Sequence, residues 1–206
     1  MNYRDVIKKL ETAALYPDKT VADSIGKTGK AAVGCFPIYT PEEIIYAAGM
    51  LPVGMWGGPT ELKRADKYLQ SFCCSIMRSN IEYGMKGTYN MLKGVVLPTF
   101  CDTLKCICEN WKVAVPHIPI IPIVYPQNRN TDAGFTYLTE EFRRVKVEVE
   151  ALAGHEISDD KLEEAWNLYE DYRETMRCFS EAAADYPQII GAKTRHLILK
   201  AGWFLD

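Results

Sequence analysis

The 206-residue sequence predicts an α/β fold: an open, parallel, doubly wound sheet of about four strands, with an added helical section from both termini. Within residues 30–130, short apolar segments alternate with segments of helical period. This alternation is typical of a parallel sheet covered by helices. Residues 131–206 show only helical periodicity, and residues 1–29 read as an amphipathic helix followed by a polar loop. We therefore expect a central α/β unit flanked by helices.

The expected elements follow one another in a regular order. Strands are predicted at residues 30–36, 51–56, 94–100 and 118–125. Helices are predicted at 40–48, 75–92, 103–112, 139–154, 158–186 and 189–204.

Two of these elements carry specific local signals. The first helix after the first strand has a capping residue at Thr40, a proline at Pro41 and an acidic residue at Glu43, which together predict a capping box. Pro119 and Pro122 remove backbone donors from the fourth strand. A strand that lacks these donors is predicted to lie at the edge of the sheet.

Composition excludes several classes of partner. The net charge is −3 and no basic block is present, so nucleic acid is not an expected partner. No apolar run approaches the about 20 residues that a membrane span needs, and the N-terminal residues do not resemble a signal peptide. Seven cysteines without a secretion signal indicate a cytoplasmic protein, in which thiols serve metals or chemistry more often than disulfides.

Two cysteines occupy positions where an α/β fold places reactive groups. Cys101 follows the third predicted strand, and Cys74 precedes the helix predicted at 75–92. Ligands of open α/β sheets collect at the carboxyl ends of strands, and helix N-termini favour a thiolate. The pair therefore suggests a metal or iron–sulfur site.

The other cysteines have less specific surroundings. Cys73 could replace Cys74 if the helix began one residue earlier, but the Cys-x-x-x-Arg-Ser spacing begins at Cys74. Cys35 ends the first strand at the same sheet edge and is either a core thiol or a group near the site. Free cysteines are often buried, so three others are predicted to be structural: Cys106, Cys108 and Cys178.

Three ordered phrases resemble the 2-hydroxyacyl-CoA dehydratase and benzoyl-CoA reductase family. Residues 34–58 resemble its opening signature, Cys74-Ser-Ile-Met-Arg-Ser79 its first cluster-ligand motif, and Cys101-Asp102 its second. Trp111 and residues 115–118 and 126–129 continue the match, which runs from about residue 28 to the end. Within the family the chain looks most like the β subunit of (R)-2-hydroxyacyl-CoA dehydratases acting on hydroxyisocaproyl- or phenyllactoyl-type substrates.

The resemblance implies a [4Fe–4S] cluster held by three cysteines in each of two similar subunits. Cys74 and Cys101 match two of them. The third would lie in a second α/β domain, absent from this chain, to which residues 131–206 lead. Cys35, Asp102 and Arg78 could then lie around the cluster, although Asp102 could equally cap a helix and Arg78 could be a solvated helix charge. An N-terminal half of this kind is expected to be inactive alone.

The activity implied by the resemblance is that of a hydro-lyase of amino-acid fermentation in anaerobes. A 2-hydroxyacyl-CoA loses water by syn elimination, through a ketyl radical, to give an (E)-2-enoyl-CoA. An ATP-dependent iron–sulfur activator supplies the electron. A homologous α subunit forms the other half of the heterodimer and carries most of the substrate site, so a β subunit would relay or store the electron.

Three other interpretations are compatible with the same residues. A benzoyl-CoA-reductase-like or double-cubane reductase subunit would use the same two cysteines. An electron-carrying module would have no substrate of its own. A plain α/β domain would keep every cysteine in its core and bind no metal.

Overall fold

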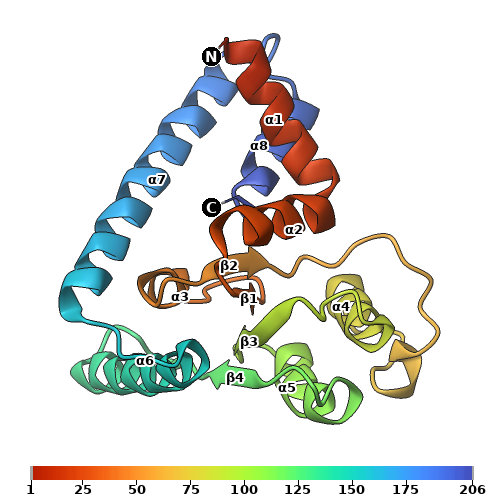
Figure 1. Cartoon of the computed structure of the whole chain (residues 1–206), viewed down its shortest axis with the longest axis vertical. Helices are drawn as coiled ribbons and strands as arrows, with labels where there is room; N and C mark the ends of the chain where they lie inside the picture. Colours follow the sequence, from red (N-terminus) through yellow and green to blue (C-terminus); the bar gives the residue numbers. More distant parts are fainter. Residues whose placement is uncertain (1, 206) are drawn as a thin grey trace.

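The computed structural model describes residues 2–205 and contains a four-stranded, all-parallel sheet in the order β2-β1-β3-β4 (Figure 1). The strands are β1 (Ala32–Cys35), β2 (Leu51–Gly54), β3 (Leu92–Pro98) and β4 (Ile120–Ile123). The helices are α1 (Tyr3–Leu15), α2 (Pro17–Thr28), α3 (Glu42–Ala47), the 3-10 helix η1 (Ala65–Lys67), α4 (Ser75–Lys86), α5 (Asp102–Ala114), α6 (Asp132–Ala153), α7 (Asp159–Asp185) and α8 (Ala192–Ala201). The predicted fold class is confirmed.

Helices cover both faces of the sheet. In Figure 1, α4 and α5 lie to the right of the strands, and α3 and α6 lie to the left. Successive residues of β3 point to opposite faces, so Val95 and Leu97 pack under α4 and α5 while Val96 packs under α3 and α6. Because both faces are buried, the strands are apolar apart from the exposed Lys93 near the start of β3, as expected of a parallel sheet.

The helical section lies beyond the β2 edge of the sheet. Figure 1 shows α1, α2 and α8 at the top, with α7 running along the left side from α6 toward α1. Ala13 and Ala14 of α1 form a small buried cluster with Leu197 and Ala201 of α8. The Gly54 amide at the end of β2 donates to the Trp203 carbonyl at 2.9 Å, which joins this section to the sheet.

Two predicted details, an edge position and a helix cap, are confirmed. β4 is an edge strand, as its prolines indicated. Ser158 caps α7 by accepting a hydrogen bond from the Lys161 amide at 3.3 Å. Within residues 2–205, no helix combines the length and apolar character that crossing a membrane requires.

Several boundaries and caps differ from the prediction. The capping box is wrong, because Pro41 occupies the N-cap position of α3 without a side-chain capping bond, and the Thr40 hydroxyl donates instead to the Phe36 carbonyl at 2.7 Å. Thr131, rather than Thr139, caps α6, and its hydroxyl accepts from the Gly134 amide at 3.1 Å. The predicted N-terminal helix and loop are two helices, since Pro17 begins α2. Helix α4 ends at Gly87, whose φ of 81° stops it before the predicted residue 92.

Candidate functional site

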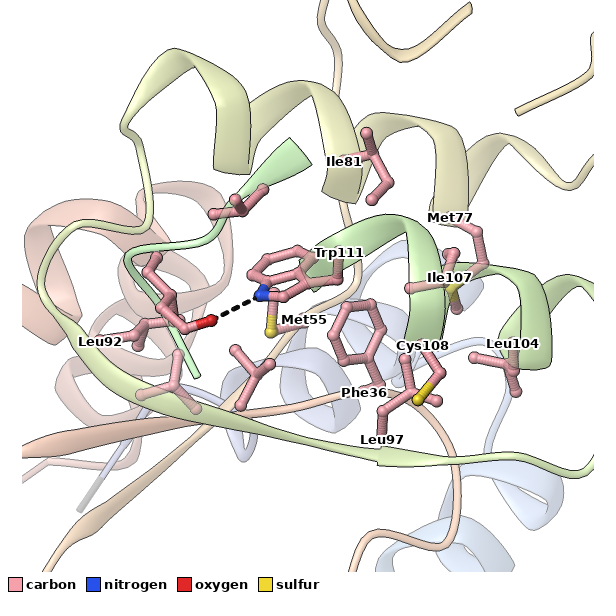
Figure 2. Close-up of a cluster of buried hydrophobic side chains, with 14 of the residues drawn as sticks. Phe36, Met55, Met77, Ile81, Leu92, Leu97, Leu104, Ile107, Cys108 and Trp111 are labelled. Carbon is pink, nitrogen blue, oxygen red and sulfur yellow. Dashed lines mark hydrogen bonds between the residues drawn. The ribbon is translucent and has the colours of Figure 1, made fainter. Parts of the chain in front are cut away.

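The N-termini of α4 and α5 lie together at the carboxyl edge of the sheet. Figure 2 shows Met77 and Leu104, each in the first turn of its helix, at the same end of one buried cluster, near Leu97 at the end of β3. Ile81 and Trp111 lie further along the two helices at the other end. The helices thus run antiparallel to the strand, which brings their first residues to the edge where α/β proteins bind ligands.

Cys74 and Cys101 occupy the N-cap positions of these two helices. Both thiols are free and exposed. The Cys101 sulfur accepts a hydrogen bond from the Leu104 amide at 3.5 Å, whereas Cys74 makes no side-chain capping bond. The third strand, predicted to run to residue 100, ends at Pro98, so Cys101 belongs to the loop between β3 and α5. The structure therefore places both cysteines at one edge; their role as ligands stays a prediction.

The neighbouring cysteines differ in exposure. Cys73 is 8% exposed and packs in the cluster under α4 and α5, which favours Cys74 over Cys73 as the accessible thiol. Cys35, the last residue of β1, is fully buried beneath α3. Burial and the nearby Glu42 raise the pKa of its thiol.

The prediction that the remaining cysteines are packed thiols holds for Cys108 alone. Cys106 and Cys178 are exposed, so their prediction as packed thiols is wrong. Cys106 lies on the solvent side of α5. Cys178 lies on α7, a 27-residue helix in which the buried residues are Ala165 and Ala183.

Asp102 and Arg78 have clear local partners. Asp102 is the first residue of α5 rather than its cap, and its exposed carboxylate forms an ion pair with Lys105 at 3.6 Å. Arg78 is not a solvated helix charge, because it forms an ion pair with Asp66 and donates to the Ser71 carbonyl at 3.3 Å. Arg78 thus joins α4 to the loop that precedes Cys74.

An exposed aromatic group adjoins Cys101, and no sequence pattern predicted it. The Tyr39 ring lies 5.7 Å from the Phe100 ring and 6.2 Å from the Tyr125 ring, measured between centroids. The Tyr125 hydroxyl donates to the Tyr39 carbonyl. Tyr39 is 61% exposed and has a φ of 68°, a conformation that L residues rarely adopt. The loops after β1, β3 and β4 therefore meet beside the cysteine.

A cavity of about 710 Å³ extends from this aromatic group toward α7. Tyr39, Glu42 and Glu43 line it from the α3 side, and Tyr169 and Arg173 line it from α7. The Glu43 carboxylate forms an ion pair with Arg173 at 2.6 Å. Burial and the neighbouring Glu43 raise the pKa of Glu42 to about 7, although Tyr169 and Arg173 oppose the shift.

Glu42 is expected to make the protein less stable as the pH rises. Its folded-state pKa lies above the ordinary value of 4.5, so the folded chain binds the proton more tightly between about pH 4.5 and about pH 7. We expect this carboxylate to lower the free energy of unfolding by about 2 kcal/mol across that window, relative to Glu42→Gln. Urea unfolding of both proteins at several pH values measures the difference.

The matched control is Glu156→Gln, because Glu156 is exposed. The free energy of unfolding of this control should change with pH as that of the wild type does. A Glu42→Gln protein with the same pH profile as the wild type would contradict the assignment.

The donor set at the carboxyl edge suits part of an iron–sulfur site. Within residues 2–205, no three His, Cys, Asp or Glu side chains are placed to share one metal ion. Two exposed thiols at helix N-termini match the thiolate chemistry of iron–sulfur ligation, and further ligands would have to come from outside these residues.

Comparisons with known proteins agree with one another. The sequence model of the family described as "2-hydroxyglutaryl-CoA dehydratase, D-component" matches residues 37–206. The (R)-phenyllactyl-CoA dehydratase beta subunit of Clostridium sporogenes is 37% identical over 205 residues, which are 100% of this chain and 53% of that protein. The lactoyl-CoA dehydratase subunit beta of Anaerotignum propionicum is 40% identical over 97% of this chain and 53% of its own length.

A third relative is named for a different type of reaction. A benzoyl-CoA reductase subunit of Thauera aromatica is 31% identical over 100% of this chain and 54% of its own length. The chain spans about half the length of the curated relatives it matches. The family model matches most of the chain, and the structure contains the predicted parallel sheet. The chain therefore belongs to the 2-hydroxyglutaryl-CoA dehydratase D-component family.

Proposed function

We propose that the chain is the cluster-binding N-terminal part of the β subunit of an (R)-2-hydroxyacyl-CoA dehydratase, a hydro-lyase. One observation carries the proposal: Cys74 and Cys101 are exposed N-caps of neighbouring helices at the carboxyl edge of the sheet. The identity of 36–40% to three dehydratase beta subunits supports this choice of enzyme.

The role of this chain's own residues follows from their position. Cys74 and Cys101 would hold a [4Fe–4S] cluster together with a third cysteine in a following α/β domain, to which α6, α7 and α8 lead. The cluster would supply one-electron chemistry for the radical dehydration of the CoA thioester. The first amides of α4 and α5 lie at the same edge of the sheet, where helix N-termini favour a negatively charged ligand.

The partners proposed for the subunit follow from the same interpretation. A homologous α subunit would form the heterodimer and bind most of the substrate. An ATP-dependent iron–sulfur activator would dock transiently and deliver the electron. Loss of dehydratase activity when any of the three proteins is left out would support this assignment.

A reductase subunit is the second candidate, because one relative is a benzoyl-CoA reductase subunit. The same two cysteines would serve it, so iron binding does not separate the two functions. Assays of the assembled protein with 2-hydroxyacyl-CoA and with benzoyl-CoA do so, since water loss and ring reduction give different products.

The decisive experiment measures iron and sulfide after anaerobic reconstitution. We expect a version extended to the full length of the relatives to hold about four irons per chain, and Cys74→Ser or Cys101→Ser to lower this by about tenfold or more. Cys106→Ser is the matched control, because Cys106 is an equally exposed thiol on α5. Iron that survives both ligand substitutions, or is lost only in the control, overturns the ligand assignment.

A further inference from the structure

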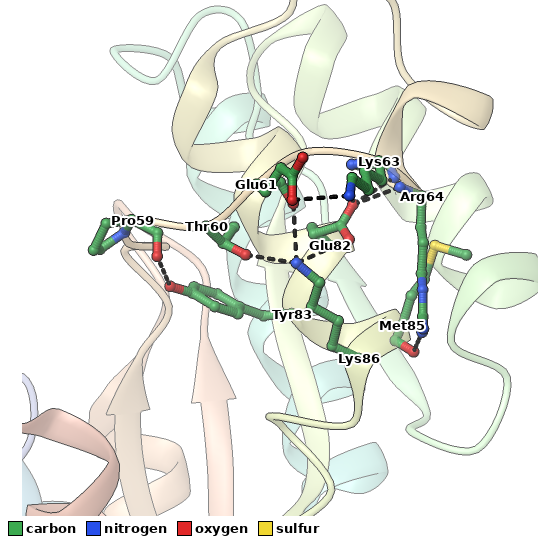
Figure 3. Close-up of polar contacts among 10 residues, drawn as sticks. Pro59, Thr60, Glu61, Lys63, Arg64, Glu82, Tyr83, Met85 and Lys86 are labelled. Atoms are coloured by element: carbon green, nitrogen blue, oxygen red, sulfur yellow. Dashed lines mark hydrogen bonds and ion pairs between the residues drawn. The ribbon is translucent and has the colours of Figure 1, made fainter.

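The segment between β2 and Cys74 is bound along the whole length of α4 (Figure 3). It begins at Gly57, whose φ is 66° and where a Cβ atom would lie 3.0 Å from the Ile76 carbonyl oxygen. A side chain there would therefore be strained and would press on the first turns of α4. We call residues 57–73 the connecting loop.

One carboxylate holds the middle of the connecting loop. Glu82 on α4 is fully buried, and its Oε2 atom accepts hydrogen bonds from three consecutive backbone amides: Lys63 at 3.0 Å, Arg64 at 2.7 Å and Ala65 at 2.9 Å. Figure 3 shows Glu82 pointing from the helix into this turn. A buried backbone amide without an acceptor costs about 1–3 kcal/mol, so this single side chain satisfies donors that the loop cannot satisfy itself.

Lys86 and Tyr83 of α4 also bind the first half of the connecting loop. Lys86 forms an ion pair with Glu82 at 3.1 Å and donates to the Thr60 hydroxyl at 2.8 Å and the Glu61 carbonyl at 2.9 Å. Figure 3 also shows the Tyr83 hydroxyl bonded to the Pro59 carbonyl, at 3.1 Å. The first half of the loop therefore depends on one turn of α4.

The second half of the connecting loop is hydrogen-bonded to α4 and α5, the two helices that Cys74 and Cys101 precede. Arg78 on α4 contacts Asp66 and the Ser71 carbonyl. Asn110 on α5 donates to the Tyr68 carbonyl at 2.7 Å. The loop thus adds a second connection between α4 and α5, beside the direct packing of the two helices.

We propose that Glu82 is a positioning residue: by fixing the connecting loop it holds Cys74 in place relative to Cys101. This inference rests on the proposed function, because it assigns Glu82 a role toward the same two thiols. Glu82 touches neither cysteine and acts through the loop. Its charge matters as well as its shape, since a carboxylate is a stronger acceptor for three amides than a neutral amide group.

Cys73 provides a direct measure of the loop's order. It is 8% exposed and ends the connecting loop immediately before Cys74, so local opening of the loop uncovers it. Cys108 lies on α5 in the same core cluster and Cys35 lies in β1, so both are buried outside the connecting loop and report global unfolding. Alkylation by iodoacetamide under native conditions, followed by mass spectrometry of each cysteine, separates the two events.

We expect Glu82→Ala to raise the Cys73 alkylation rate by about tenfold or more beyond any rise shared with Cys108 and Cys35, because the shared rise reports the loss of global stability. Glu82→Gln keeps an acceptor oxygen and should give a smaller rise, which provides a second test if the alanine variant does not fold. An unchanged Cys73 rate in both variants overturns the proposal. A uniform rise at all three buried cysteines also overturns it, because that shows general destabilisation.

Asn80→Ala is the matched control. Asn80 lies on α4, closer to Cys74, and is fully buried. Its side chain donates to the Met55 carbonyl at 2.7 Å and accepts from the Tyr89 hydroxyl at 2.6 Å, so it makes buried hydrogen bonds but none to the connecting loop. The ratio of Cys73 to Cys108 alkylation should therefore stay at the wild-type value.

Iron binding by the extended protein is the last part of the test. Glu82→Gln should lower iron content per folded chain, and Asn80→Ala should not. If Glu82→Gln opens the loop but keeps its iron while Cys74→Ser loses it, the positioning role is wrong and the proposed function stands. If Cys74→Ser keeps its iron, the proposed function fails, and the role of Glu82 fails with it.

Discussion

Replacing Trp111 with alanine is expected to lower the free energy of unfolding by about 4 kcal/mol, because the change leaves a large cavity in a close-packed core. Trp111 is fully buried beneath α4 and is the largest side chain in its cluster (Figure 2). Its ring meets Phe36 edge to face, with centroids 5.6 Å apart, and its indole N–H donates to the Ile118 carbonyl at 2.9 Å. Urea denaturation followed by circular dichroism measures the loss.

Trp111→Phe separates the two contributions of this side chain. Phenylalanine keeps much of the apolar contact but leaves the buried Ile118 carbonyl without its donor, so an intermediate loss of about 2 kcal/mol is expected. Replacement of the exposed Trp166 by alanine should cost much less, since Trp166 is 56% exposed. A Trp111→Ala protein as stable as the Trp166→Ala control would contradict the packing described for this core.

The second large effect is the acid sensitivity that Glu82 confers. Burial by itself would raise the pKa of this carboxyl, but the hydrogen bonds from Ala65, Arg64 and Lys63 and the contact with Lys86 together lower it to about 2. Its stabilising effect is therefore complete above about pH 4.5 and is lost as the pH falls toward about 2. On acidification from about pH 6 to about pH 3, the free energy of unfolding of the wild type should fall by about 2 kcal/mol more than that of Glu82→Gln.

Urea unfolding of the wild type and Glu82→Gln at these pH values tests the prediction. The difference in stability between the two proteins should be large at neutral pH and should narrow on acidification. Glu61→Gln is a suitable control, because Glu61 lies in the same loop but its side chain is 71% exposed. A difference between wild type and Glu82→Gln that stays constant with pH would contradict the lowered pKa of this carboxyl in the folded protein.

Much of the sheet could be predicted because parallel strands leave strong local signals. The run around Val95 and Val96 is apolar on both faces, and the prolines at 119 and 122 predicted the edge position of β4. The placement of Cys74 and Cys101 at helix N-termini followed from the same alternation of strands and helices.

Other features depend on contacts between residues far apart in sequence. Thr40 looked like a helix cap, but a carbonyl after β1 competes for its hydroxyl. Glu82 looked like any acidic residue of a helix, because its three amide partners lie 17 to 19 residues earlier in the chain. Glu42 likewise owes its raised pKa mainly to burial, which depends on the packing of α3 against the distant helix α7. No local pattern encodes these arrangements.

The pairing of α1 with α8 has a consequence for synthesis on the ribosome. Ala13 and Ala14 find their buried partners in residues made much later, Leu197 and Ala201. At about 5–20 residues per second, α1 waits on the order of ten seconds or more for that partner. Throughout that interval the face of α1 that α8 later covers is open to solvent and to chaperones.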